Sequence, residues 1–323
     1  MIRTRLTERF GLAAPVVSAP MAFAAGGELA AAVTHAGGLG LIGGGYGDAD
    51  WVDAAFASAG NARVGCGFIT WRLAERPQAL EVALARRPAA VMLSFGDPAF
   101  FAPLLAEAGV PMICQVQTLR HAMRAAEAGA AAIVAQGAEA GGHGDRRGTF
   151  ALVPEVADWL AAHAPETLLL AAGGVADGRG LAAALMLGAD GVLVGSRFWA
   201  SAEARVSPAM HAAALAASGD DTIRSSVMDL VRGLDWPGRY TARVLRNPFT
   251  DRWHGREEAL RAAAAREGPA WGAAFAAGDP ERSNTFVGEA AGLIRDVRPA
   301  GEILAGMVAE AEALLGGGWR RSG

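Results

Sequence analysis

Over its first 200 residues the chain repeats one pattern of hydrophobic and polar positions. An alanine-rich segment with helical periodicity ends at a glycine, and a short run of apolar residues follows. Glycine supplies the left-handed conformation that ends many helices. Apolar runs without alternation are typical of parallel strands buried on both faces. The pattern predicts such strands over residues 15–20, 39–43, 63–69, 90–95, 111–116, 131–135, 167–172 and 190–195.

Segments with helical periodicity separate these strands and give the fold class. A chain of eight consecutive strand–helix units predicts an α/β protein, specifically a (β/α)8 TIM barrel. A doubly wound parallel sheet, which uses fewer strands, is the alternative. The helices are expected to begin near Glu28, Asp48, Arg76, Pro98, Thr118, Leu152, Asp177 and Ser196.

The pattern changes after residue 200. The stretch WPGRYTARVLRNPFTDRW combines arginine and aromatic residues with turn signals, and helices are expected around 256–267 and 299–315. We expect residues 1–204 and 286–323 to form the barrel, and residues 205–285 to form a smaller, mainly helical cap. Long insertions usually carry function, so we expect the cap to close over the barrel mouth.

Composition narrows the classes of function. The chain has 323 residues, of which 52% are hydrophobic, and its net charge of −4 argues against a nucleic-acid partner. It contains no lysine, which excludes Schiff-base chemistry and a P-loop lysine. Cys66 and Cys114 lie far apart in apolar runs, so we expect buried, reduced thiols and a cytoplasmic protein.

Neither a metal site nor a membrane span is expected. The histidines show no metal-ligand spacing and have no accompanying carboxylate cluster. Residues 10–27 carry no charge, which approaches the length of a membrane span. Pro15, Pro20, Gly26 and Gly27 interrupt this stretch, however, so it is interpreted as a strand, a turn and the start of a helix.

Two glycine-rich loops, AAGGVADGRG and VGSRF, follow the seventh and eighth predicted strands. TIM barrels have their active sites at the carboxyl ends of the strands, and these two loops often bind a phosphate there. Unpaired amides at glycine turns and helix starts bind anions. We therefore expect phosphate contacts from Gly173, Gly174, Gly195 and Ser196, with two ordinary turns as the alternative.

Other strand ends carry side chains that suit a flat heteroaromatic ligand. Met21 offers a soft thioether to a ring system, and the amides of Gln115 and Gln136 can donate and accept at its edge. In the glycine-rich segment AQGAEAGGHGD, His143 is either a proton-transfer group or an exposed histidine in a flexible loop. Together these features predict an oxidoreductase barrel that binds flavin mononucleotide (FMN).

Several segments also resemble a known family. APMA near the start, AQGAEAGGH, AAGGVADGRG and GVLVGSRF closely resemble nitronate monooxygenases, formerly called 2-nitropropane dioxygenases, and the C-terminal FVGEAAGLI is similar too. Members are FMN-dependent TIM barrels. The resemblance implies that His143 is the catalytic base beside the flavin. It also implies FMN contacts from Met21, Ala22, Gln136, Gly141, Gly173, Gly174, Val194, Gly195 and Ser196.

The activity implied by the resemblance is oxidative denitrification. A nitronate, or a nitroalkane after loss of its α-proton, reduces FMN, and reaction with dioxygen gives a carbonyl compound and nitrite. The expected partners are thus a small-molecule substrate and dioxygen, with neither nucleic acid nor membrane. A homodimer is one possible assembly.

The sequence departs from the family pattern at the expected flavin site. Gly67 stands where many relatives have an FMN-contacting asparagine, and Gln115 stands where some have lysine. The pocket-lining lysines and tyrosines of well-studied members have no identified counterpart, since Tyr46 and Tyr240 are the only tyrosines. Two other functions stay open: an NAD(P)H-dependent FMN reductase acting on a quinone or an enoyl thioester, and a non-catalytic flavin-binding protein.

Overall fold

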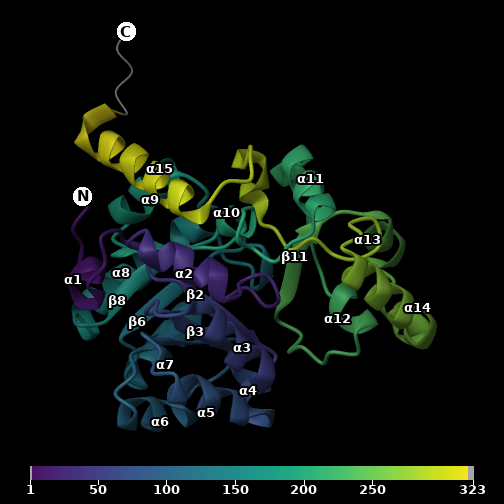
Figure 1. Ribbon diagram of the computed structural model, residues 1–323, viewed down its shortest axis with the longest axis horizontal. Coiled ribbons are helices and arrows are strands. Elements are labelled where there is room, and N and C mark those ends of the chain that lie inside the picture. Colours follow the sequence, from purple (N-terminus) through teal and green to yellow (C-terminus); the bar gives the residue numbers. More distant parts are fainter. Residues whose placement is uncertain (1, 319–323) are drawn as a thin grey trace.

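The computed structural model describes residues 2–318, which contain a parallel eight-stranded sheet (Figure 1). The strands follow the order β1–β9–β8–β6–β5–β4–β3–β2. The two ends of this order meet where Val17 bridges Leu39, whose amide donates to the carbonyl of Val16 at 3.0 Å. The sheet therefore forms the TIM barrel that the sequence predicts. Its strands are β1 (Val16–Ser18), β2 (Leu41–Gly45), β3 (Gly65–Ile69), β4 (Val91–Ser94), β5 (Met112–Val116), β6 (Ala132–Gln136), β8 (Leu168–Ala172) and β9 (Gly191–Val194).

Helices alternate with the strands and cover the outside of the barrel. Side chains such as Val17, Leu41 and Met92 fill the interior, and a second apolar layer lies between the strands and the helices. No helix within residues 2–318 has the length and apolar character needed to cross a membrane. The helices around the barrel are α1 (Arg5–Phe10), α2 (Gly27–His35), α3 (Ala49–Ala59), α4 (Thr70–Glu75), α5 (Gln78–Ala85), η1 (Pro98–Phe100), α6 (Ala102–Glu107), α7 (Leu119–Glu127), α8 (Thr149–His163), α9 (Gly178–Met186), α10 (Ser196–Trp199) and α15 (Ala300–Ala313).

Local signals in the sequence define where these helices begin and end. The side chains of Asp48, Thr118 and Asp177 accept hydrogen bonds from first-turn amides of α3, α7 and α9. Such caps stabilise a helix by about 1 kcal/mol each. After α7 and α9, Gly129 and Gly188 adopt the left-handed conformation, with φ of 85° and 93°. These short-range features made the strand–helix alternation predictable.

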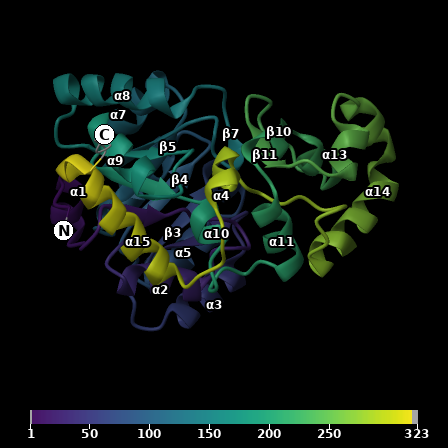
Figure 2. The ribbon, with the colours of Figure 1, turned by 90° about the horizontal axis from the view of Figure 1, so that it is seen from above.

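A second group of elements lies to one side of the barrel (Figure 2). Its centre is an antiparallel sheet of order β10–β11–β7. The third strand, β7 (Gly142–Gly144), comes from the connection that follows β6. The other elements between α10 and α15 are α11 (Pro208–Ala216), η2 (Gly219–Asp221), β10 (Thr222–Ser225), α12 (Val227–Val231), β11 (Thr241–Leu245), α13 (Pro248–Trp253), α14 (Glu257–Ala277) and η3 (Glu289–Leu293), and the turn η4 (Leu314–Gly318) follows α15.

This second group differs from the sequence prediction in two details. The predicted helix around 256–267 continues as α14 to Ala277, past Pro269. Buried Leu260 and Trp271 lie on either side of this proline, and their packing outweighs the hydrogen bond that proline removes. The strands β10 and β11 were not predicted either, since arginine interrupts both and their pairing forms over long range.

The two cysteines are free, buried thiols, as predicted. Burial raises the pKa of Cys114 to about 12, and it raises the pKa of the Cys66 thiol as well. A thiol becomes a nucleophile only as the thiolate. Both side chains therefore act as small apolar core residues.

Candidate active site

A cavity of about 430 Å³ lies at the carboxyl ends of the barrel strands. Ligand sites commonly have volumes of about 300–1,000 Å³, and the active sites of TIM barrels lie at this end of the strands. The structure therefore brings most of the residues singled out in the sequence to one place. Those that line the cavity are Met21, Ala22, Gly67, Gln115, Gln136, Gly141, His143, Gly173, Gly174, Gly195 and Ser196.

Val194 lies outside this lining. Its side chain is fully buried among the apolar residues between strands and helices. Side chains alternate along a strand, and the neighbouring residues Leu193 and Gly195 line the cavity instead. The Val194 carbonyl accepts a hydrogen bond from the amide of Ala19 at 2.9 Å. Any contact of Val194 with a ligand is thus restricted to its main chain.

His143 lies on a strand rather than in a flexible loop. It pairs with Ala242 of β11, and its main-chain carbonyl accepts a hydrogen bond from Gln136 Nε2 at 3.0 Å. Gln136 in turn accepts from Gln117 Nε2 at 2.9 Å. The side chain of His143 is only 9% exposed. The side chain is thus buried, and both the barrel and the antiparallel sheet hold its main chain. The alternative of an exposed histidine in a flexible loop is therefore wrong.

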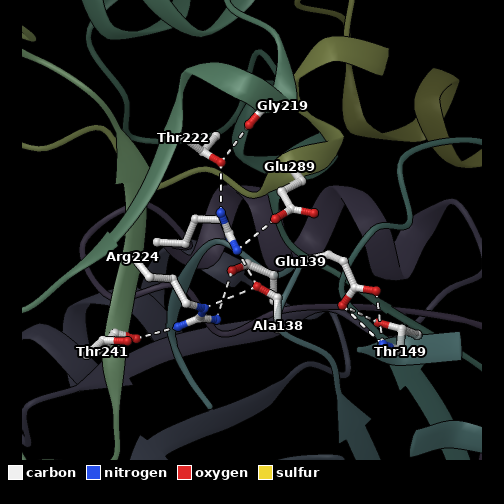
Figure 3. Close-up of polar contacts among 10 residues, drawn as sticks. Ala138, Glu139, Thr149, Gly219, Thr222, Arg224, Thr241 and Glu289 are labelled. Carbon is white, nitrogen blue, oxygen red and sulfur yellow. Dashed lines mark hydrogen bonds and ion pairs between the residues drawn. The ribbon is translucent and has the colours of Figure 1, made fainter. Parts of the chain in front are cut away.

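Two arginines fix the connection between β6 and β7 (Figure 3). Arg224 of β10 and Arg243 of β11 are directly opposite each other, and the Nε atoms of both donate to the Ala138 carbonyl, at 3.2 and 3.1 Å. Arg224 Nη1 also donates to the Thr241 carbonyl at 2.6 Å. Arg243 forms an ion pair with Glu289 at 2.7 Å. The connection that leads to His143 is thus held by charged donors.

The imidazole of His143 contacts a carboxylate that the sequence analysis did not identify. His143 Nε2 lies 2.8 Å from Asp229 Oδ2, and Arg232 Nη2 lies 2.9 Å from the other oxygen of Asp229. Burial has the largest single effect on the pKa of His143 and, together with the charges of Arg232 and Arg224, lowers it more than Asp229 raises it. His143 is therefore a neutral imidazole at neutral pH. Within residues 2–318, no group of three or more histidine, cysteine or acidic side chains forms a metal site.

Aromatic side chains enclose His143. Trp236 stacks on its imidazole, with ring centroids 3.5 Å apart and an interplanar angle of 6°. The rings of Phe95 and His143 meet in an edge-to-face arrangement, with centroids 6.1 Å apart. Phe23 and Phe275 also line the cavity. A wall of this kind excludes water, which strengthens charge interactions inside the cavity.

Tyr46 and Arg232 supply the cavity with a phenol and a cation. Both line it, and the Tyr46 hydroxyl accepts hydrogen bonds from Arg232 Nη2 at 3.2 Å and from Trp236 Nε1 at 3.3 Å. A tyrosine, Tyr46, therefore lines the cavity in this chain. The sequence did not reveal the contact between Tyr46, Arg232 and Trp236, because Tyr46 is far from the other two residues along the chain. The three-residue spacing of Asp229 and Arg232, which suits an ion pair within one helical turn, was the one available signal.

The two glycine-rich loops present main chain to the cavity. Gly174 has φ of 77°, and a Cβ atom there would meet nothing nearer than 3.7 Å; at Gly195 the nearest atom would be 3.6 Å away. Both positions therefore leave space that a side chain would fill. The hydroxyl of Ser196, the first residue of α10, accepts a hydrogen bond from the Gly288 amide at 2.9 Å. A phosphate could approach the amides of these loops closely.

Position 67, where the sequence analysis noted a glycine in place of asparagine, has no room for a side chain in this structure. A Cβ atom at this position would lie 2.3 Å from Cγ of Pro20, which is far inside van der Waals contact. The Pro20 ring occupies the space where a larger residue would begin. The strand β3 and the segment after β1 therefore approach each other more closely than any side chain at position 67 would permit.

Comparisons with known proteins agree with this geometry. The family model "Nitronate monooxygenase" matches residues 3–63 and 68–310. The chain is 36% identical to the nitronate monooxygenase npaC of Metarhizium robertsii, over 93% of this chain and 91% of that protein. Among solved structures, FabK from Thermotoga maritima has a TM-score of 0.85 at 30% identity, over 99% of this chain and 100% of that one. Nitroalkane oxidase from Streptomyces ansochromogenes has a TM-score of 0.78 at 27% identity, over 96% and 99%. The chain is thus a flavin-dependent oxidoreductase that belongs to the nitronate monooxygenase family.

Proposed function

We propose that the protein is an FMN-dependent enzyme that oxidises nitronates, and nitroalkanes after removal of their α-proton, to carbonyl compounds and nitrite with dioxygen. The observation that carries this proposal is the buried, neutral imidazole of His143 on the wall of an apolar cavity. A general base must be unprotonated and within reach of the substrate. Both conditions point to His143.

The glycine loops support FMN as the flavin. The open Cβ positions of Gly174 and Gly195 leave room for a group that contacts main-chain amides, and Ser196 lies at the start of α10, where amides have no helical partner. A single phosphate bound at the last two strand loops is common in TIM barrels. A bound flavin would supply the redox chemistry, by accepting electrons from the substrate and delivering them to dioxygen.

The protein's own residues would act on the proton and on the surrounding water. His143 would take the α-proton of a neutral nitroalkane, since burial favours its uncharged form. The rings of Trp236 and Phe95 cover the imidazole and keep water from competing for it. General-base assistance of this kind is worth roughly 10²- to 10⁴-fold in rate.

Two measurements test the function. In the first, flavin-loaded protein is mixed anaerobically with a nitronate, and separately with NADH and NADPH, while the flavin absorbance is followed. We expect fast bleaching by the nitronate. Fast bleaching by a reduced nicotinamide alone would replace the proposal with the FMN reductase. No bleaching by any of them would favour a non-catalytic flavin protein.

In the second, His143→Ala is assayed with a neutral nitroalkane and with its pre-formed nitronate. We expect the variant to retain flavin and to lose at least about 100-fold in turnover of the neutral nitroalkane. Turnover of the pre-formed nitronate should fall much less, because no proton needs to be removed from it. Unchanged turnover of the nitroalkane would rule out His143 as the base.

A further inference from the structure

The polar contact between His143 and Asp229 restricts where the imidazole can carry its proton. A carboxylate accepts hydrogen bonds but does not donate them, and Asp229 Oδ2 lies 2.8 Å from His143 Nε2. Nε2 must therefore be the protonated nitrogen of the neutral ring. Nδ1 then carries the lone pair. Among residues 2–318, Nδ1 has no hydrogen-bond partner and is not one of the fully enclosed unpaired polar atoms.

We propose that Asp229 is a positioning residue that fixes the tautomer of His143, so that Nδ1 is the atom that takes the substrate proton. This inference rests on the proposed function, because it concerns the base of the same reaction. In the step, the α-carbon–hydrogen bond of the nitroalkane breaks, the proton goes to Nδ1, and the electron pair remains on the substrate as the nitronate. The resulting imidazolium keeps its Nε2–H directed at the Asp229 carboxylate.

The surroundings of Asp229 favour this role over a merely structural one. The Asp229 side chain is 3% exposed and that of Arg232 is 17% exposed. A buried ion pair is costly to desolvate and is weak evidence for stability. Here the pair instead holds one carboxylate oxygen toward the base. Arg232 occupies the other oxygen and also donates to Tyr46, whose hydroxyl accepts from the indole that stacks on His143.

The same arrangement fixes the ring itself. Trp236 covers one face of the imidazole, and Nε2 is tied to α12. The charged groups that act on the ring are Asp229 and Arg232 from α12 and the residue after it, and Arg224 from β10. Asp229 supplies the negative charge among them. It is therefore the group that would offset the positive charge of the protonated base.

Asp229→Asn tests the inference by exchanging the tautomer. Arg232 only donates, so the amide oxygen of the asparagine should turn toward Arg232, leaving its NH₂ group to face Nε2. That arrangement moves the ring proton to Nδ1 and blocks the base. We expect turnover of a neutral nitroalkane to fall at least about 100-fold, since the comparable exchange in a serine protease costs about 10⁴-fold. Flavin content should be unchanged, and turnover of pre-formed nitronate should fall less than about 10-fold.

Asp235→Asn is the matched control, because this aspartate lies in the segment between α12 and β11, just after the helix that carries Asp229, and is exposed. This variant should behave as the unaltered protein. Equal losses with nitroalkane and nitronate, or loss of flavin in Asp229→Asn, would assign Asp229 a structural role and overturn the inference. Heteronuclear NMR of protein labelled with the heavy nitrogen isotope in histidine provides a readout independent of activity. It should show the Nε2–H tautomer in the unaltered protein and Nδ1–H in Asp229→Asn. Nδ1–H in the unaltered protein would overturn the inference even if the nitronate activity is confirmed, and Nε2–H would support it even if that activity is absent.

Discussion

Replacing Arg224 with methionine should reduce activity far more than stability. Methionine keeps much of the length of the side chain but removes its donors to the Ala138 and Thr241 carbonyls. Hydrogen bonds from a charged donor contribute about 1.5–3 kcal/mol each, so their loss alone would cost several kcal/mol. Ala138 keeps its bond from Arg243 Nε at 3.1 Å, which reduces that cost.

An opposing contribution comes from the buried charge of Arg224. Burial, together with the neighbouring Arg243, lowers its pKa from 12.5 to about 10. Keeping Arg224 charged in the folded protein therefore costs about 3 kcal/mol relative to water, and replacement by uncharged methionine removes that cost. The two effects nearly cancel, and we expect the free energy of unfolding to fall by only about 1 kcal/mol. Displacement of catalytic groups by about 1 Å can cost about 10²-fold, so kcat/KM should fall about 10- to 100-fold because the connection leading to His143 loosens.

Urea unfolding and steady-state kinetics with a neutral nitroalkane measure these two quantities on the same samples. Arg246→Met is the matched control, because the side chain of Arg246 is half exposed and, among residues 2–318, pairs only with the exposed Asp251 at 3.2 Å. Its effect should stay within about 0.5 kcal/mol. If Arg224→Met keeps kcat/KM within about 2-fold, the arginine pair does not hold the catalytic connection. A loss of more than about 4 kcal/mol would refute the cancellation.

Two further predictions concern pH and the cofactor. Burial lowers the pKa of His143 below its ordinary 6.5, so the midpoint of the decline in kcat/KM for a neutral nitroalkane at low pH should lie below 6.5. A profile between about pH 5 and 8 checks this, and a midpoint above 6.5 would contradict it. Gly195→Ala should weaken FMN binding about 10-fold or more while changing the stability of the flavin-free protein by less than about 0.5 kcal/mol. A Cβ atom at Gly195 would meet no protein atom nearer than 3.6 Å and would occupy space at the cavity wall. Flavin fluorescence titration measures the affinity for FMN, and thermal unfolding measures the stability. Unchanged affinity for FMN would place the phosphate elsewhere.

The barrel could be predicted from the sequence because its signals are short-range. Each strand is a continuous apolar run that becomes buried on both faces, and caps such as Asp177 and glycines such as Gly188 mark the helix ends within a few residues. The glycine loops could be placed as well, since barrel topology puts every strand's carboxyl end at the same mouth. Local periodicity and topology were sufficient for these parts.

The environment of His143 could not be predicted in this way. His143 lies between two glycines, a composition with low strand propensity, and it becomes part of a strand because β11 pairs with it. Its partner Asp229 is 86 positions away in the sequence. It lies on a helix of five residues, which is too short for its sequence pattern to predict a helix. Steric details such as the Pro20 ring against Gly67 also depend on how two strands approach each other. These features come from long-range pairing, which one sequence does not specify.

Two parts of the molecule hold His143. The main chain of His143 is held by the barrel through Gln136 and by the second group of elements through β11. Its side chain is held by Asp229 of α12 and by Trp236, both from that second group. A shift of residues 205–285 relative to the barrel would therefore move the imidazole's partners while Gln136 holds its carbonyl in place. If His143 is the base, proton removal would depend on the position of the second group of elements, whereas the glycine loops after β8 and β9 belong to the barrel.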